Sequence, residues 1–382
     1  MKKEYKDFIS LIRSIFDENY DFDISKIDLR VMFNMAKSHS MSNLIYYAFK
    51  DKNISSNIEE FIYKQHMGSL YRQALISNEG KCVFKSLSNN NIEVMPLKGW
   101  YVKEYYPSED MRPMSDIDVL FYIKDIEKIE YLMKNMGYNL RKGDENHYIF
   151  EKPPFIMFEF HPCIFHDNDI MSSHMNPGWQ YAKKDIDNPI KRMTDEGLYI
   201  YQMAHLAKHF FEGGTGIRSV LDIWIIRQVI GKKLDFDYIN NEFEKAGILE
   251  FSKNIEQLSD IWFSGHESTK YFDELGTYIV ESGTFGTAEN AVLNSVIKNN
   301  NNDKKVIFFI KKIFYPYSQM KHRYTVLKYL PFLLPIFWII NIFRVLLNRT
   351  EKLKLYVKAV KNTETSDIIK HKEKMRKFGL KI

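Results

Sequence analysis

The sequence predicts an α+β fold, with a small mixed β-sheet flanked by helices and an all-helical C-terminal domain. Two observations predict it. Between residues 91 and 161, short runs with period-2 apolar patterns are separated by helical patterns. From Thr194 onward the strand patterns fade, and apolar residues recur with the 3.6-residue period of helices. A chain of 382 residues is long enough for two domains.

The first 90 residues are expected to be helical. Phe8, Ile9, Ile12 and Ile15 form a helical stripe, and Ile58–Leu87 is a second long stretch with few helix breakers. We therefore predict an N-terminal helical segment over residues 1–90.

Residues 91–190 are predicted to form the α/β core. The expected order is strand, helix, strand, helix and a hairpin that turns at Pro153-Pro154. The predicted bounds are Ile92–Leu97, Trp100–Tyr106, Asp116–Tyr122, Asp125–Met136, His147–Phe150 and Phe155–His161. This order suits a small mixed sheet with helices packed against it.

The remaining chain is predicted as a helical domain, 191–348, and a basic tail, 349–382. The boundary is placed near residue 190, after Pro189. Helices are expected over Asp195–Phe211, Ile217–Ile230, Asp237–Phe263 and Ala288–Lys298.

The pair Asp116 and Asp118 is the clearest chemical signal. Residues i and i+2 of a strand point to the same face, about 6.5 Å apart along the chain. Two carboxylates so placed can converge on divalent cations about 3.5–4 Å apart, as phosphoryl and nucleotidyl transfer require. Paired acids also occur on solvated strand faces. Glu159 is the only charge in the apolar strand Phe155–Phe160, and burying it is costly unless it is paired or binds metal.

Three segments together resemble the DNA-polymerase-β-like nucleotidyltransferase superfamily: Leu97–Gly99, Arg112–Leu120 and Phe158–His161. Within it, the chain is most similar to the bacterial uncharacterised nucleotidyltransferase family. The resemblance extends to the helical residues 205–222 and to the aromatic region 315–344.

The resemblance implies transfer of an NMP from an NTP to a hydroxyl or similar acceptor on a small molecule, a peptide or a protein. It implies two Mg²⁺ (or Mn²⁺) ions held by the catalytic residues Asp116, Asp118 and Glu159. Nucleotide-binding residues would be Lys98, Gly99, Arg112 and Ser115, with His161, His205, His209, Arg218 and Asp222 around the site. The wider superfamily has Gly-Ser where this chain has Gly99-Trp100. That departure supports an alternative, a non-catalytic binding protein of the same fold at a membrane surface.

Other constellations leave alternatives open. His205 and His209 share a helix face and could bind zinc, but the glutamate of an H-E-x-x-H helix is missing. Arg218 and Asp222 have the spacing of an intrahelical ion pair, although Arg218 also suits a phosphate. Glu159, His161 and Cys163 alternate as zinc ligands would, but Pro162 interrupts the strand.

Composition indicates the cellular compartment and the class of partner to expect. Two cysteines and no signal-peptide pattern lead us to expect a cytoplasmic protein. From Arg349 to Ile382, eleven Lys or Arg stand against four acids, so the first 348 residues are near neutral. A large nucleic-acid-binding face is therefore not expected.

The run Tyr329–Leu347 is the most apolar of the chain, with prolines at 331 and 335 in its first third. The favoured interpretation is a buried core helix. The second is a membrane-surface helix backed by the basic tail, with peripheral membrane contact through residues 329–382.

Overall fold

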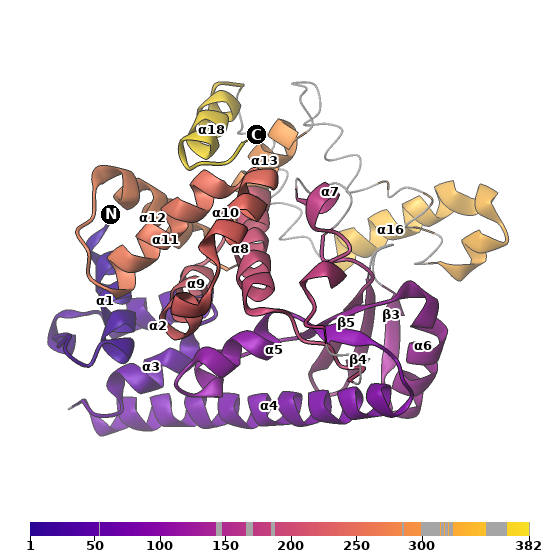
Figure 1. The fold of residues 1–382 in the computed structure, drawn as a ribbon, viewed down its shortest axis with the longest axis horizontal. Helices are drawn as coiled ribbons and strands as arrows, with labels where there is room; N and C mark the ends of the chain where they lie inside the picture. Colours follow the sequence, from indigo (N-terminus) through magenta and orange to yellow (C-terminus); the bar gives the residue numbers. More distant parts are fainter. Residues whose placement is uncertain are drawn as a thin grey trace.

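The protein is built around one five-stranded mixed sheet with helices packed against it (Figure 1). This computed structural model describes residues 1–52, 54–142, 147–165, 171–184, 188–284, 286–298, 314, 317, 320, 324–348 and 365–381. The α+β class predicted from the sequence is confirmed.

The sheet has the order β1-β2-β5-β4-β3. Its strands are β1 (Val94–Pro96), β2 (Ile117–Phe121), β3 (Asn139–Lys142), β4 (Tyr148–Lys152) and β5 (Ile156–His161). The pairing of β2 with β5 is parallel, and the other three pairings are antiparallel. The central pair therefore runs in one direction, which brings corresponding ends of two distant segments together.

Alternation along the central strands separates a core face from a site face. Val119 and Phe121 of β2, with Phe158 and Phe160 of β5, pack into one apolar cluster with α4 (Ser56–Asn89) and α6 (Ile126–Asn135). Because side chains alternate in direction along a strand, Asp118 and Glu159 must point to the opposite face.

The structure corrects several predicted elements. Strand β3 was missed because its sequence is short and polar, as edge strands often are. The helix expected over Trp100–Tyr106 is a single α-turn, α5 (Gly99–Val102), followed by the 3-10 helix η2 (Lys103–Tyr105).

The helix predicted over Asp237–Phe263 is two helices, α10 (Phe236–Lys245) and α11 (Leu249–Phe263). Gly247 separates them with a φ of 72°, a left-handed conformation that favours glycine and ends helices. Helix α12 (Lys270–Ser282) was not predicted.

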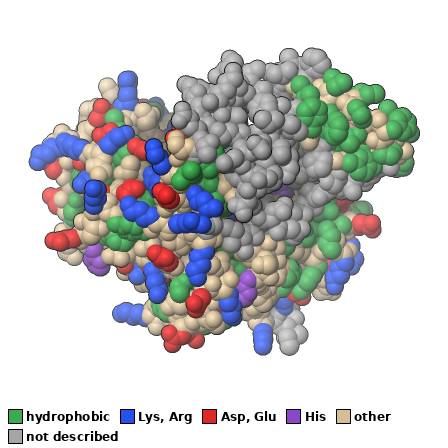
Figure 2. Space-filling view, turned by 90° about the horizontal axis from the view of Figure 1, so that it is seen from above, with side chains coloured by type: hydrophobic (Ala, Val, Ile, Leu, Met, Phe, Trp, Pro, Cys, Tyr) green, Lys and Arg blue, Asp and Glu red, His purple; other side chains and the backbone are tan. Residues whose placement is uncertain are grey.

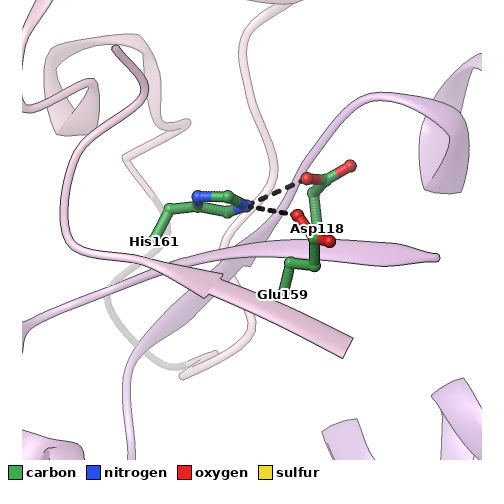
Figure 3. Close-up of side chains that lie close together, drawn as sticks. All are labelled: Asp118, Glu159 and His161. Atoms are coloured by element: carbon green, nitrogen blue, oxygen red, sulfur yellow. Dashed lines mark hydrogen bonds and ion pairs between the residues drawn. The ribbon is translucent and has the colours of Figure 1, made fainter. Parts of the chain in front are cut away.

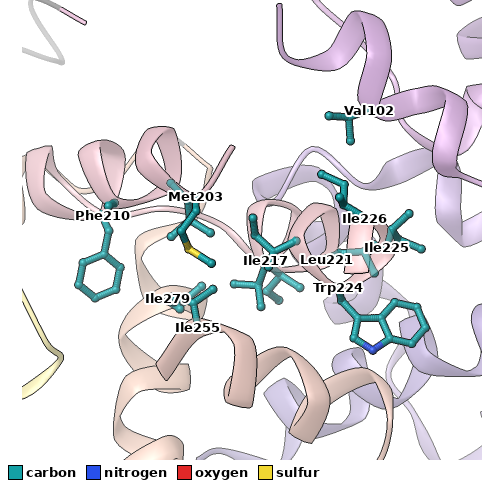
Figure 4. Packing of buried hydrophobic residues seen from close by; sticks show 14 of the residues in the cluster. Val102, Met203, Phe210, Ile217, Leu221, Trp224, Ile225, Ile226, Ile255 and Ile279 are labelled. Atoms are coloured by element: carbon teal, nitrogen blue, oxygen red, sulfur yellow. The ribbon is translucent and has the colours of Figure 1, made fainter. Parts of the chain in front are cut away.

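Most of the remaining helices share one core. They are α1 (Lys3–Phe16), α2 (Leu29–Ser38), α3 (Ser42–Phe49), α7 (Ser172–Met175), α8 (Asp195–Glu212), α9 (Ile217–Ile230), α13 (Ala288–Lys298) and α18 (Thr365–Lys377). Helix α16 (Leu334–Asn348) contributes no described residue to this core. Figure 4 shows Phe210 of α8, Leu221 of α9 and Ile279 of α12 within this cluster, which also includes Phe8 of α1.

The chain near the predicted boundary lies against the sheet edge. Val94 of β1 donates to the Pro189 carbonyl at 3.0 Å and accepts from Lys191 at 2.7 Å, and it forms a parallel bridge with Ile190. The domain limits drawn from the sequence stay a prediction.

The expectation that Tyr329–Leu347 forms a buried core helix is wrong. Ile336 and Ile339 of α16 are 54% and 55% exposed, because only one side of this helix is covered. Part of the predicted tail, α18, packs against α13, and residues 349–364 of that tail lie outside the described residues. Within the described ranges, no helix is both long and apolar enough to cross a membrane.

His39 gives the helical body a pH-sensitive contact. It is 1% exposed, its Nδ1 accepts from the Ile217 backbone N–H at 3.2 Å, and burial lowers its pKa to about 4. The folded state therefore holds the imidazole neutral. Protonation favours the unfolded chain, so stability is full above the ordinary pKa of 6.5 and falls as the pH drops toward 4.

We predict that the buried His39 lowers the free energy of unfolding by about 2 kcal/mol when the pH falls from 7.5 to 5. Urea unfolding at both pH values should show the wild type losing that much more stability than His39→Gln, which cannot titrate. Equal losses in the two proteins would contradict the assignment.

Candidate metal and nucleotide site

The site lies on the face of the sheet opposite α4 and is organised by the parallel pairing of β2 with β5. That pairing places Asp118 directly beside Glu159. The two carboxylates come from segments that the sequence predicted separately, and the register brings them together.

Asp118, Glu159 and His161 form a group that could hold a metal ion (Figure 3). One ligand atom of each lies within 4.8 Å of the others. His161 Nε2 is 3.0 Å from Asp118 Oδ1 and 3.8 Å from Glu159 Oε2. Among the described residues this is the only cluster of three such groups. Cys163, which the zinc alternative would use, does not belong to it.

Asp116 lies just before β2 and does not join that cluster. Its Oδ1 accepts a hydrogen bond from the Ser115 hydroxyl at 3.2 Å. Burial and the nearby Asp118 carboxylate raise the pKa of Asp116, so it lies close enough to Asp118 for mutual repulsion. The structure thus places Asp116 beside the cluster and gives Ser115 a role in orienting it.

Lys98 neutralises Asp118 directly. Its Nζ donates to Asp118 Oδ1 at 2.8 Å, and Asp118 is only 5% exposed. Lys98 has a φ of 47°, a left-handed conformation that is strained for a residue with a side chain. Strain of this kind is found at sites where a side chain must be held in one position.

The three carboxylates titrate differently because their partners differ. Burial alone would raise the pKa of Asp118, but Lys98 and His161 hold it well below its ordinary range. Burial, followed by repulsion from Asp118 and Asp116, raises the pKa of Glu159. A cation bound among these acids would relieve that repulsion.

Arg112 does not reach the carboxylate cluster. It forms a bidentate ion pair with Asp222 of α9, with Nε and Nη2 at 3.1 and 2.8 Å from the two carboxylate oxygens. The Tyr106 hydroxyl donates to the same Asp222 at 2.7 Å. Asp222 therefore pairs across the fold with Arg112 and not, as one interpretation of the spacing had it, with Arg218 one turn earlier.

Arg218 is the cation of this region that forms no ion pair among the described residues. Its Nη1 donates to the Pro113 carbonyl at 3.4 Å, and no carboxylate in the described part of the chain lies within ion-pair distance. Burial and the neighbouring Arg112 lower its pKa to about 10. Asp116 is among the charges that act on it, so the guanidinium lies near the carboxylates.

The turn after β1 carries Trp100, whose side chain packs toward the core. The Trp100 ring packs against α4, where a Cβ added to Gly80 would lie 2.3 Å from it, and its centroid is 4.9 Å from that of Phe84. A Cβ at Gly99 would lie 2.8 Å from Arg112 Nη1, so this glycine makes room for Arg112. The indole therefore belongs to the core side of the turn.

Helix α8 contributes the group that sequence reasoning missed, Tyr201. It is buried, and both Lys98 and Asp118 act on its pKa, which burial raises. His205 follows one turn later, with ring centroids 5.9 Å apart, and its Nε2 is 3.0 Å from that of His209. The i, i+4, i+8 spacing of Tyr201, His205 and His209 was the available signal.

The zinc alternative for His205 and His209 gains no third ligand among the residues that the structure describes. Burial and then His209 lower the pKa of His205, and the Lys98 charge acts in the same direction. Positive charge nearby disfavours a further cation at this pair.

The donor set on the sheet fits a hard divalent cation. Two adjacent carboxylates supply the oxygen ligands that Mg²⁺ and Mn²⁺ prefer. The surrounding cations Lys98 and Arg218 would suit the negative charge of a phosphate chain. The arrangement can therefore bind a metal and a polyphosphate side by side.

The buried Arg112–Asp222 ion pair gives a prediction about the stability of the fold. Both side chains are buried, so Asp222→Asn leaves a buried guanidinium without its counter-charge and should lower the free energy of unfolding by about 3–5 kcal/mol. Asp260→Asn, which breaks the more exposed pair with Arg227, should cost only about 1 kcal/mol. Denaturant unfolding checks both, and equal losses would contradict the buried pair.

Comparison with known proteins places the chain. The model of a family described as "Uncharacterised nucleotidyltransferase" matches residues 25–264. No curated protein sequence matches.

Two solved structures of the antibiotic-resistance factor ANT(2'')-Ia are similar at 11% identity. A solution structure has a TM-score of 0.35 and covers 45% of this chain and 92% of that one. A crystal structure with adenylyl-2''-tobramycin has a TM-score of 0.27 and covers 51% and 99%. Because its model covers more than half of the sequence, the chain belongs to the uncharacterised nucleotidyltransferase family.

Proposed function

We propose that the protein is a metal-dependent enzyme that transfers an NMP from an NTP to a hydroxyl or similar group on a small molecule, a peptide or a protein. The observation that carries the proposal is the register of β2 and β5, which gathers Asp118, Glu159 and His161 within 4.8 Å. Family membership supports nucleotidyl transfer in general, and the site supports the requirement for metal.

In this proposal Asp116, Asp118 and Glu159 hold two Mg²⁺ or Mn²⁺ ions. Bound ions would neutralise the triphosphate and lower the pKa of the acceptor hydroxyl. The acceptor oxygen forms a bond to the α-phosphorus, the bond to pyrophosphate breaks, and Glu159 takes the proton.

The triphosphate is held by side chains more than by the turn. The backbone N–H groups of Trp100 and Tyr101 already donate to the carbonyls of Leu97 and Lys98, each at 3.3 Å. These two groups are therefore not free for a phosphate. Lys98 and Arg218 take that role in the proposal, while Arg112 is held beside Gly99 by its ion pair with Asp222.

Helix α8 faces the acceptor side in this proposal. Tyr201 and His205 lie one turn apart on α8, and the Lys98 charge acts on the pKa of both. They would contact the acceptor next to the attacking oxygen. Testing ATP, GTP, CTP and UTP separately identifies the NTP that the enzyme uses.

The carboxylates give the first prediction. Asp116→Asn combined with Asp118→Asn should reduce turnover by several orders of magnitude, more than about 4 kcal/mol of activation free energy, because the metal ligands are lost. Mass spectrometry of acceptors incubated with each NTP measures the added NMP. Glu151→Gln, on the neighbouring strand β4 but paired with Arg141, should keep full activity. Near-full activity in the double variant would refute the metal assignment.

Replacing Arg218 is predicted to raise the stability of the fold and to weaken nucleotide binding. Arg218→Met removes a partly buried charge that has no ion-pair partner among the described residues, so the free energy of unfolding should rise. The same change should weaken binding of the NTP with Mg²⁺ by about 1.5–3 kcal/mol, measured by isothermal titration.

Arg227→Met is the matched control on the same helix. Arg227 is paired with Asp260, so its loss should lower stability and leave nucleotide affinity unchanged. If Arg218→Met destabilises the fold and binds the NTP as the wild type does, its role is structural and the proposed phosphate contact is wrong.

A second candidate function is a non-catalytic binding protein of the same fold. The ion pair of Lys98 with Asp118 favours it, because it already neutralises a metal ligand. Titration of each NTP with and without Mg²⁺ separates the two. An enzyme binds the NTP only with metal and loses that binding in Asp118→Ala, whereas metal-independent binding would favour the alternative.

A further inference from the structure

The outer side of the last described helical region before residue 349 is a continuous apolar surface. It lies on the 3-10 helices η8 (Thr325–Lys328) and η9 (Pro331–Leu333) and on α16. Its residues, which we call the outer apolar face, are 42–81% exposed: Val326, Tyr329, Leu330, Phe332, Ile336, Ile339 and Ile340. Figure 2 shows hydrophobic side chains gathered at that end of the molecule.

The opposite side of α16 is occupied by the protein. The Phe337 ring packs on Tyr324 with centroids 4.5 Å apart, and Trp338 packs on Phe314 at 5.4 Å. Positions 332, 336, 339 and 340 have the spacing of one helix face, turned away from these contacts. The first seven residues of α16, 334–340, are all apolar, and only one side of this stretch is covered.

The part of this surface on η9 and α16 carries no charged residue, whereas Lys328 ends η8. From Pro331 to Phe343 the sequence contains no Asp, Glu, Lys or Arg. The other run of exposed apolar residues, Phe61–Tyr71 on α4, lies among Glu59, Glu60 and Lys64. Contiguous exposed apolar surface of this kind marks an interaction site.

The charge of the flanking sequence indicates what the surface meets. Residues 304–361, which contain the outer apolar face, carry thirteen Lys or Arg and a single acid, Glu351. The chain as a whole is only +5, so the remainder is net negative. Basic residues directly before and after an apolar helix face are typical of segments that bind anionic lipid.

The dimensions favour lying on a bilayer over crossing it. Helix α16 has 15 residues, about 22 Å at 1.5 Å per residue, whereas the hydrocarbon core is about 30 Å thick. Tyr329, which is 81% exposed, supplies an aromatic side chain of the kind that favours the membrane–water interface.

We propose that the outer apolar face docks the protein onto the surface of an anionic lipid membrane, with α16 lying in the interface plane. The apolar side chains enter the headgroup boundary, and the flanking lysines and arginines meet the lipid charge. This proposal is independent of the nucleotidyl-transfer chemistry and is tested without it.

The test is co-sedimentation of the full chain with vesicles of phosphatidylcholine alone or mixed with phosphatidylglycerol. The wild type should sediment with the mixed vesicles, weakly with the neutral ones, and less at high salt because the electrostatic part is screened. The triple variant Phe332→Ser, Ile336→Ser, Ile339→Ser keeps every basic residue. Its affinity for the mixed vesicles should be lower by a factor of about ten or more.

The control removes three exposed apolar side chains elsewhere, Tyr131→Ser, Val229→Ser and Tyr238→Ser, and should bind as the wild type does. Circular dichroism and urea unfolding confirm that each variant folds. Equal binding by the wild type and the first triple variant would overturn the proposal. So would a wild-type protein that ignores both vesicles but forms a dimer which that variant dissociates, because the face would then bind a second copy.

Discussion

The parallel pairing of β2 with β5 is the constraint on which the candidate site depends. It joins segments about forty residues apart and sets Asp118 beside Glu159. Because side chains alternate along a strand, a slip of one residue in either strand would turn its carboxylate into the core with Val119 or Phe160. The apolar residues of the two strands, packed against α4 and α6, resist that slip. The same burial that stabilises the sheet therefore holds the acids on the other face.

Charge around the site is arranged so that one cation is left over. Lys98 pairs with Asp118, and Arg112 pairs with Asp222 in a buried bidentate contact. Arg218 has no such partner among the residues that the structure describes. A partly buried cation without an ion pair costs stability, which supports the proposal that Arg218 contacts an anionic ligand. The strained backbone of Lys98 indicates the same priority of site geometry over stability.

Much of this could be predicted from the sequence, for local reasons. The alternation around Asp118 and the single charge at Glu159 reveal which face each acid occupies, and both strands are confirmed. Contacts made across the fold left no local pattern: the partner of Asp222 is Arg112, 110 residues away, although Arg218 has the better spacing. Trp100 could not be assigned from the sequence, because its pocket is made by Gly80 on another helix. Tyr201 was hidden within the apolar pattern of a buried helix, and α16 has an exposed face that hydropathy alone does not distinguish from a core.

The central claim is that the acids on this sheet hold a divalent ion for nucleotidyl transfer. The most direct measurement is anomalous diffraction from crystals soaked with Mn²⁺ and a non-hydrolysable NTP. The account predicts an anomalous peak bounded by Asp118 and Glu159, with the nucleotide phosphates beside it. Nucleotide bound elsewhere, or a peak absent from these carboxylates while the NTP is bound, would contradict it.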